Sequence, residues 1–320
     1  MMEKQYTISG TEIGAILGLN PYQTPMDLYM RKLGLIDREP ENEAMKWGIA
    51  AEHVVARRYN RENRERDFRL FPSIDEGYDY KKPLVHPDYE WWVGTPDRGI
   101  VSSPIKFQGI LEIKIVGERM ADQWGEPPNG DVPEQYLTQC AWYMPLLGVE
   151  WADLAVQIGN RDYRVYRINR DQELEDQLRD AALAFINDHL IPQVPPAIDG
   201  SESSKRYLNY KYPKDREPIL EPTDDDILAM VDGYHLAKRQ YKDLEGEISN
   251  YENRLKLIIG DAAGMKGEFG KIYWKKNKDS RKTNWEGLAM SLNPSPDDLE
   301  RFTVTKPGAR VFRAYWAKED

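Results

Sequence analysis

An eight-residue stretch, Gly109–Val116, constrains the fold of this chain most strongly. Its apolar residues are largely β-branched, which predicts a buried strand. Because strand side chains alternate between two faces, the apolar set on one face is Leu111, Ile113 and Ile115. Glu112 and Lys114 share the other face. Burying charges is costly unless they have partners, so the stretch predicts a polar site, with Mg²⁺ as the expected partner of the carboxylate.

Composition bounds the class of protein. The chain has 320 residues and is 40% hydrophobic, which is enough for one large domain or two modest ones. Its single cysteine, Cys140, excludes a disulfide framework, a cysteine zinc site and a multi-cysteine iron–sulfur cluster. There is no stretch of signal-peptide or membrane-span length. We expect a soluble protein of the cytoplasm that makes no membrane contact.

The net charge of −10 by itself argues weakly against nucleic acid, because phosphate binding usually shows as excess Lys and Arg. The charge is unevenly distributed, however. Residues 266–284 hold seven Lys or Arg and two acidic residues, a local net charge of +5. An acidic metal site would also contribute to the negative net charge of the whole chain.

The N-terminal region predicts two short helices. Ser9 or Thr11 is expected to cap the first, which contains Ile13, Ile16 and Leu17. The cap is either structural only or part of a phosphate-binding helix N-terminus. Thr24 and Pro25 begin the second helix, which ends at Gly34.

A longer helix is expected over about residues 43–63. Its apolar stripe comprises Trp47, Ala51, Val54, Val55 and Tyr59. Glu52 adjoins this stripe and is either a solvated helix residue or part of a site.

Strands are expected over residues 68–94, followed by the turn Gly94–Gly99. In this turn Asp97 follows Pro96 at the end of a strand, where its side chain can reach a cleft. Aspartate is also common in turns for purely local reasons.

Beyond the central strand, a helix is expected from Pro133 to Gly148, with polar Gln139 among apolar neighbours and therefore in need of partners. Residues 151–168 predict a hairpin, and residues 170–190 an amphipathic helix.

These elements predict an α/β (α+β) core over residues 1–195, with a central mixed sheet flanked by helices. Residues 196–222 are rich in Pro, Ser and Gly and are expected to be a linker. A C-terminal extension over residues 223–320 follows. Residues 224–259 predict a long helix or a helical hairpin, whose heptad spacing looks too imperfect for a coiled coil. A basic β-hairpin is expected over residues 270–285, and strands in the tail.

Asp97, Glu112 and Lys114 together supply the groups needed for metal-assisted phosphodiester hydrolysis. Mg²⁺ takes one or two carboxylates plus water and substrate phosphate. A neighbouring lysine can orient or deprotonate the attacking water, or neutralise the transition state. The Asp-x(14)-Glu-x-Lys pattern is loose and would occur by chance in many proteins. It is informative here because Asp97 follows a proline at a strand end, and because Glu112 and Lys114 share one face of a strand.

GTPDR followed by LEIKI resembles the PD-(D/E)XK nuclease superfamily. Three further motifs, TISGTEIGAILGLNPYQTP, WGIAAEHVV and PEQYLTQCAWYM, occur in the order of the lambda-exonuclease-like, YqaJ-type viral recombinase family. The resemblance covers about residues 5–190. It implies a restriction-endonuclease-like core.

The resemblance also implies residue roles. Asp97 and Glu112 would bind metal, joined by the Ile113 carbonyl and by Glu52. Lys114 would be the catalytic lysine, and Gln139 would orient it or the attacking water. The resemblance places Ser9 and Thr95 at the 5′-phosphate of the degraded strand. We also expect phosphate or DNA contacts from Thr11, Arg31, Lys32 and Tyr136. The family's N-terminal arginine is missing, since only Lys4 precedes Tyr6. Lys4, Arg31 or Lys32 takes its place, or the preference for a 5′-phosphate is weaker.

The implied activity is ATP-independent 5′→3′ degradation of double-stranded DNA ends. It leaves 3′ overhangs for a single-strand annealing protein in a bacterial or phage-infected cell. The implied cofactor is Mg²⁺, two ions per site, with Mn²⁺ as an expected substitute. The family also implies homo-oligomers, including a ring trimer.

Two alternatives stay open. One is a metal-dependent DNA endonuclease on the same core. The other is a non-catalytic DNA-binding recombination scaffold, supported by aromatic residues among the C-terminal basic residues. Accessory DNA contacts would come from Lys275, Lys276, Lys278, Arg281 and Lys282.

Overall fold

The computed structural model describes residues 6–37, 40–63, 69–71, 83–102, 106–128, 130–215, 219–305 and 312. The chain divides into two compact units, residues 1–212 and 213–320. The expected linker, residues 196–222, is not a linker throughout, because Glu202–Lys211 form helix α6 of the first unit. The Ser203 hydroxyl of this helix hydrogen-bonds the Thr24 hydroxyl at 2.7 Å. A core ending at residue 195 would therefore omit a packed helix.

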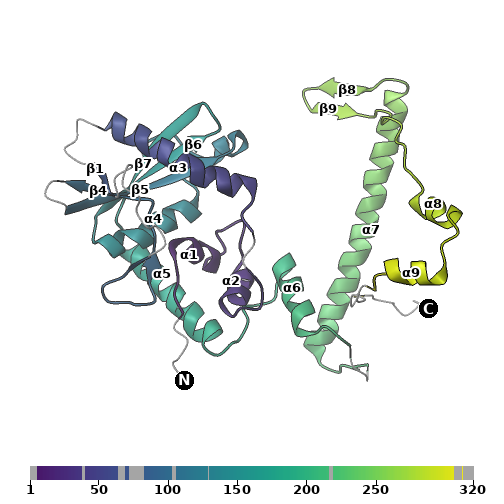
Figure 1. Ribbon diagram of the computed structural model, residues 1–320, viewed down its shortest axis with the longest axis horizontal. Coiled ribbons are helices and arrows are strands. Elements are labelled where there is room, and N and C mark those ends of the chain that lie inside the picture. The colour runs from purple at the N-terminus through teal and green to yellow at the C-terminus, as the bar shows by residue number, and fades with distance from the viewer. Residues whose placement is uncertain are drawn as a thin grey trace. The chain divides into compact units, whose positions relative to one another are not determined.

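The first unit is built on the mixed sheet that the sequence predicts. Its strand order is β1-β4-β5-β6-β7 (Figure 1). β5 and β6 are parallel, and the other neighbours are antiparallel. The strands are β1 (Arg69–Phe71), β4 (Arg98–Ser102), β5 (Lys106–Val116), β6 (Trp151–Ile158) and β7 (Asp162–Asn169). The expected hairpin over residues 151–168 is confirmed as β6 and β7.

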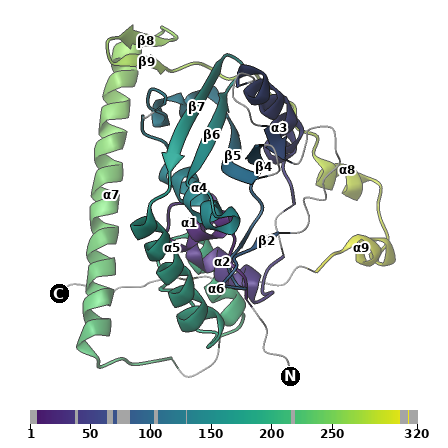
Figure 2. The ribbon, with the colours of Figure 1, turned by 90° about the vertical axis from the view of Figure 1, so that its left-hand side faces the viewer.

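Side-chain alternation along β5 separates two apolar clusters. Leu111 and Ile113 pack with Val55, Ala56 and Tyr59 of α3 (Glu43–Glu62). Residues of the opposite β5 face belong to the larger cluster, which includes α1 (Gly10–Ile16), α4 (Glu134–Leu147) and α5 (Gln172–Phe185). Figure 2 shows α3 on one side of the sheet and α4, α1 and α5 on the other. The predicted two faces of β5 are confirmed.

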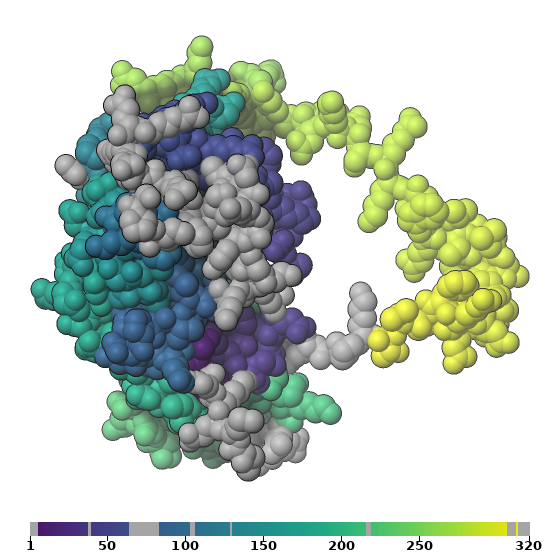
Figure 3. Space-filling view, turned by 60° about the vertical axis from the view of Figure 1, so that its left-hand side comes forward, coloured from purple at the N-terminus to yellow at the C-terminus, as the bar shows by residue number. Residues whose placement is uncertain are grey.

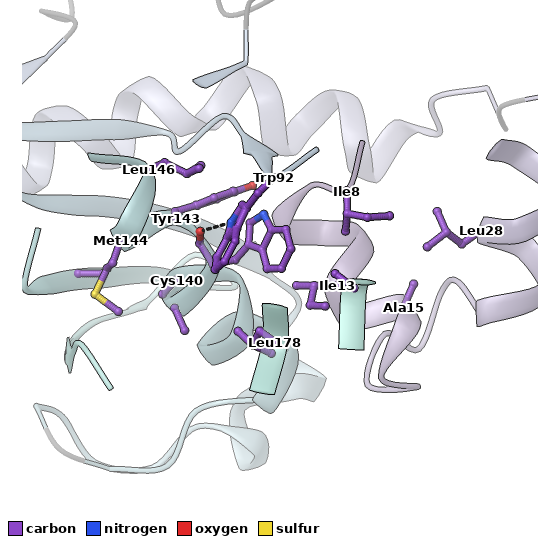
Figure 4. Packing of buried hydrophobic residues seen from close by; sticks show 14 of the residues in the cluster. Ile8, Ile13, Ala15, Leu28, Trp92, Cys140, Tyr143, Met144, Leu146 and Leu178 are labelled. Atoms are coloured by element: carbon purple, nitrogen blue, oxygen red, sulfur yellow. Dashed lines mark hydrogen bonds between the residues drawn. The ribbon is translucent and has the colours of Figure 1, made fainter. Parts of the chain in front are cut away.

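The larger cluster is rich in aromatic residues. The rings of Trp92 and Trp142 stack with centroids 4.3 Å apart, and Trp92 Nε1–H donates to the Trp142 carbonyl at 3.0 Å. Figure 4 shows Trp92 in the middle of this core, with Tyr143 on one side of it and Ile13 on the other. The small sheet of β2 (Leu84–Val85) and β3 (Val93–Gly94) carries Trp92 to this position. α2 (Pro25–Lys32), η1 (Glu118–Gln123) and η2 (Ile186–Leu190) complete the unit.

The expected apolar stripe of α3 is only partly buried. Val55 and Tyr59 lie in the core, but Trp47 is 66% and Val54 65% exposed. The predicted stripe was therefore wrong at Trp47 and Val54, which lie on a part of the helix surface that no described residue covers. Periodicity shows where apolar residues lie on a helix, but it does not show whether another element covers them.

The second unit begins with one continuous helix, α7 (Asp225–Ile259), instead of a helical hairpin. The β-hairpin comprises β8 (Gly264–Gly267) and β9 (Gly270–Tyr273). The prediction of a hairpin over residues 270–285 was therefore wrong. Gly270, at φ = 98°, stands at the turn, so the strands lie on either side of it.

The residues expected to form the basic hairpin lie mostly after it. Lys275, Lys276, Lys278, Arg281 and Lys282 are exposed in a segment without regular structure. Part of the tail expected as strands is helical, since α9 (Pro296–Phe302) follows α8 (Trp285–Ser291). Neither helix, yellow in Figure 3, has a buried residue. The rest of the expected tail strands lies largely outside the described residues. Among the described helices, none is both long and apolar enough to cross a membrane.

Candidate active site

Two carboxylates meet where β4 begins beside the middle of β5. Asp97 directly precedes β4, whose first residue, Arg98, pairs with Leu111. The Ile113 N–H donates to the Asp97 carboxylate at 2.7 Å, and the Asp97 N–H lies 3.4 Å from Glu112 Oε2. Asp97 is thus held beside β5 by a backbone donor.

The Glu112 carboxylate is buried and paired with Lys114. Lys114 Nζ donates to Glu112 Oε1 at 2.7 Å, with Glu112 at 1% and Lys114 at 18% exposure. Burial, and then the Asp97 carboxylate, raise the pKa of Glu112 to about 7. Burial alone would lower the pKa of Lys114, but Glu112 and Asp97 raise it by more. The lysine is therefore held as a cation facing two carboxylates.

Glu52 reaches the same region from α3. It meets Arg98, whose Nη1 donates to Glu52 Oε1 at 2.6 Å and to the Asp97 carbonyl at 2.5 Å. Burial and the nearby Asp97 raise the pKa of Glu52, against the opposing effects of Arg98 and Lys114. Glu52 is consequently not a fully solvated helix residue, although it is 23% exposed.

Arg98 is the residue that our sequence interpretation missed. Its side chain is 1% exposed, and it lies on the α3 side of the sheet. A buried arginine implies a carboxylate partner, but the sequence did not identify Glu52, 46 residues away, as that partner. The signal available was an arginine inside an apolar strand, directly after Asp97.

Gln139 contacts Tyr143, not Lys114. Its Nε2 donates to the Tyr143 hydroxyl at 3.1 Å, and both residues are buried on α4. Burial and then Glu112 raise the pKa of Tyr143, while the Gln139 hydrogen bond opposes the rise. Glu112 is therefore near enough to affect Tyr143, and Gln139 reaches the site through this tyrosine.

Tyr136 places its aromatic ring beside the lysine. Lys114 Nζ is 5.3 Å from the Tyr136 ring centroid, and this ring stacks on Trp124 at 5.6 Å. A cation over an aromatic face is favourable, so Tyr136 supports the charged form of Lys114.

The residues expected at the N-terminal phosphate pocket gather around Glu12. Arg31 Nη2 lies 3.0 Å from Glu12 Oε1, and Lys32 Nζ 2.8 Å from Glu12 Oε2. The Ser9 N–H also donates to Glu12, at 2.9 Å, and the Ser9 hydroxyl lies 3.4 Å from that of Thr11. These residues are brought together, with both basic side chains paired to one carboxylate.

Two other expected phosphate contacts are not joined to that group by any contact described. Thr95 is exposed in the turn before Asp97. Lys4, considered as a substitute for the missing arginine, lies outside the described residues. The five C-terminal basic residues belong to the second unit.

The donor chemistry of the site fits a hard divalent cation. Asp97, Glu112 and Glu52 offer carboxylate oxygens, and the Ile113 carbonyl a further oxygen, as Mg²⁺ prefers. Within the described ranges, no group of three or more His, Cys, Asp or Glu side chains is arranged as a metal cage. Lys114 and Arg98 instead pair with one oxygen of Glu112 and one of Glu52.

Comparison with known proteins finds several that are similar to this chain. The chain is 29% identical over 279 residues to the uncharacterized protein YqaJ of Bacillus subtilis (strain 168), covering 86% of this chain and 82% of that protein. Solved structures of lower similarity include an alkaline exonuclease (LHK-Exo) from Laribacter hongkongensis, with 18% identity, a TM-score of 0.41, and 64% of this chain and 92% of that chain covered.

A phage-related exonuclease from Haemophilus somnus 129PT has 14% identity and a TM-score of 0.41, covering 59% of this chain and 97% of that chain. The family match is independent of these weaker structural likenesses. The model of the YqaJ-like viral recombinase domain matches residues 2–150, which include Asp97, Glu112, Lys114, Glu52 and Gln139. Residues 2–150 of this chain are therefore similar to the YqaJ-like viral recombinase domain.

Proposed function

We propose that this protein is a Mg²⁺-dependent, ATP-independent exonuclease that degrades one strand of a DNA duplex from its 5′ end. The observation that carries the proposal is the meeting of Asp97, Glu112 and Lys114 at one point of the sheet. The fold holds these charged groups in or beside its core, where they are costly unless they serve a purpose.

The carboxylates and the lysine would have different roles because their charges are opposite. Asp97 and Glu112 would hold the cation, with Glu52 reaching the same place from α3. Mg²⁺, when bound, would supply Lewis-acid activation of the scissile phosphodiester. The raised pKa of Lys114 favours a positively charged lysine that stabilises the negative charge developing on the phosphate. This favours charge stabilisation over proton abstraction by the lysine.

Tyr143 and Gln139 would orient the reacting side chains without contacting the substrate. The Gln139–Tyr143 hydrogen bond lies on α4, on the side of the sheet that Glu112 faces. A fixed tyrosine hydroxyl there would keep the Glu112 and Lys114 side chains oriented. Gln139 would accordingly be a positioning residue.

The substrate and partners follow from the same proposal. Double-stranded DNA ends would enter near Asp97, and the product would be a 3′ single-stranded overhang for an annealing protein. Mn²⁺ would substitute for Mg²⁺, two ions would serve each site, and the nuclease units would assemble as a homo-oligomer such as a ring trimer. Ser9, Thr11, Thr95, Arg31 and Lys32 would hold the terminal phosphate.

A linear duplex labelled at either its 5′ or its 3′ ends, with and without 5′-phosphate, tests the proposal. We expect early release of the 5′ label as short products in Mg²⁺ without ATP, while the 3′ label stays on long strands. A closed circular duplex should stay intact. Nicked or linearised circles would indicate an endonuclease, and binding without cleavage would indicate a scaffold.

A further inference from the structure

We propose that α7 pairs with α7 of a second copy of this chain as an antiparallel two-stranded coiled coil. The proposal does not depend on the nuclease function. It concerns the second unit alone and begins with a repeat along its long helix.

One set of mostly apolar and aromatic residues of α7 follows a heptad repeat without interruption. The a positions are Ile227, Tyr234, Tyr241, Ile248 and Leu255, and the d positions are Met230, Ala237, Leu244, Tyr251 and Ile258. The alternating spacing of three and four residues continues for more than four heptads, about 47 Å at 1.5 Å per residue. The prediction that the heptad spacing is too imperfect for a coiled coil was therefore wrong, because the spacing is regular in this register.

The stripe formed by these a and d residues is accessible. Apart from half-buried Leu255, each of its residues is exposed, with 74% of Met230 and of Ile258 accessible. Tyr234 also contacts the Phe312 ring at 5.7 Å. Ile259 is the only buried residue of α7. Since helices in proteins are stabilised chiefly by packing an apolar face, a 35-residue helix of this kind calls for a partner along its stripe.

The stripe is complementary to itself when one helix is reversed. An antiparallel pair sets a opposite d, which gives the layers Ile227–Ile258, Met230–Leu255, Tyr234–Tyr251, Ala237–Ile248 and Tyr241–Leu244. Every a residue then has a d partner, and the small Ala237 faces a larger Ile248. The two-fold axis passes between Lys242 and Asp243. Such a closed, isologous contact is typical of homodimers.

The flanking charges select this orientation. In a parallel pair, g residues face the following e residues of the partner, so Glu247 would face Glu252 twice. In an antiparallel pair, e faces e, and Lys238 lies near Glu245 twice. The g residues then pair Gln240 with Glu247, without like charges. The sequence thus penalises the parallel pair and supports the antiparallel one.

The mass of the full-length chain in solution tests the pairing. We expect sedimentation velocity to give an even number of chains, which is two for paired single chains and six for paired ring trimers. Leu244→Glu, a change at an exposed d position, should halve that number. The matched control is Asn253→Glu, at an f position on the outer face of the same helix, which should keep the wild-type mass. A monomeric wild type, an odd number of chains, or an unchanged mass for Leu244→Glu would overturn the proposal.

Disulfide cross-linking of full-length chains tests the orientation. Met230→Cys chains mixed with Leu255→Cys chains should form a covalent pair on mild oxidation, because the two positions share a layer. Neither variant alone should cross-link efficiently. Native Cys140 is buried and should not compete. Efficient cross-linking of each variant with itself would indicate a parallel pair and would overturn the antiparallel assignment.

Discussion

Arg98 Nη1 lies 2.6 Å from Glu52 Oε1, so a buried strand residue holds a helix carboxylate beside Asp97. The same Nη1 also donates to the backbone carbonyl of Asp97. Arg98 thus contacts both Glu52 and the residue that carries the first carboxylate of the candidate site. Arg98 therefore supplies the positive charge that lets α3 bring an acidic residue to the sheet.

Replacing Arg98 by Met should lower the free energy of unfolding by about 3 kcal/mol, because it leaves the Glu52 carboxylate without its partner. Arg98→Lys should recover only part of the loss, since an ammonium cannot reproduce the planar donor geometry. The measurement is urea unfolding followed by circular dichroism. In a Glu52→Gln background the loss should be clearly smaller, and equal losses in both backgrounds would show that Arg98 acts through other contacts.

The sequence predicted the features that depend on local periodicity. The two faces of β5 follow from alternation, and Asp97 beside Glu112 follows from a strand end meeting that strand. The Arg98–Glu52 pair could not be predicted in this way, because it joins residues far apart in sequence through the packing of α3.

Exposed apolar residues were a second source of error. Trp47 and Val54 have the spacing of a buried stripe but lie on the part of α3 that the described core leaves uncovered. In α7 the error went the other way, because a regular heptad repeat was predicted to be imperfect. Its register is clear once residues 225–259 are known to form one uninterrupted helix. In both helices, periodicity identified a face without identifying what packs on it.

Gly94→Ala should destabilise the protein by about 1–3 kcal/mol, because overpacking a well-filled core is costly. A Cβ at this position would lie 2.5 Å from Tyr143 Cε1 and 2.7 Å from a Leu146 methyl. Thermal unfolding should show the loss. Gly48→Ala is the matched control, since a Cβ there meets nothing within 4 Å, and it should be neutral or stabilising by up to about 1 kcal/mol. Equal effects of the two changes would contradict this packing of Tyr143.

Protonation of His86 should destabilise the fold. Its ring stacks on Trp92 at 4.9 Å, and its Nδ1 accepts the Asp88 N–H at 3.1 Å, which requires an unprotonated Nδ1. Burial lowers the pKa of His86 below its usual 6.5. The stabilisation is therefore present above about pH 6.5 and is lost as the pH falls through the lowered pKa.

The free energy of unfolding, measured between about pH 7.5 and pH 5 for wild type and His86→Gln, checks this sign. The decrease on acidification should be smaller in the variant. A larger decrease in the variant would mean that the folded protein favours the protonated ring.

The most direct test of the nuclease assignment is the rate at which Lys114→Ala cleaves linear duplex DNA in Mg²⁺, measured beside its DNA affinity. We predict a rate at least about 100-fold lower with DNA affinity largely retained, because the change removes the cation paired with Glu112. Lys106→Ala, an exposed lysine at the start of the same strand, should cleave like wild type. Cleavage by Lys114→Ala at the wild-type rate would contradict the account.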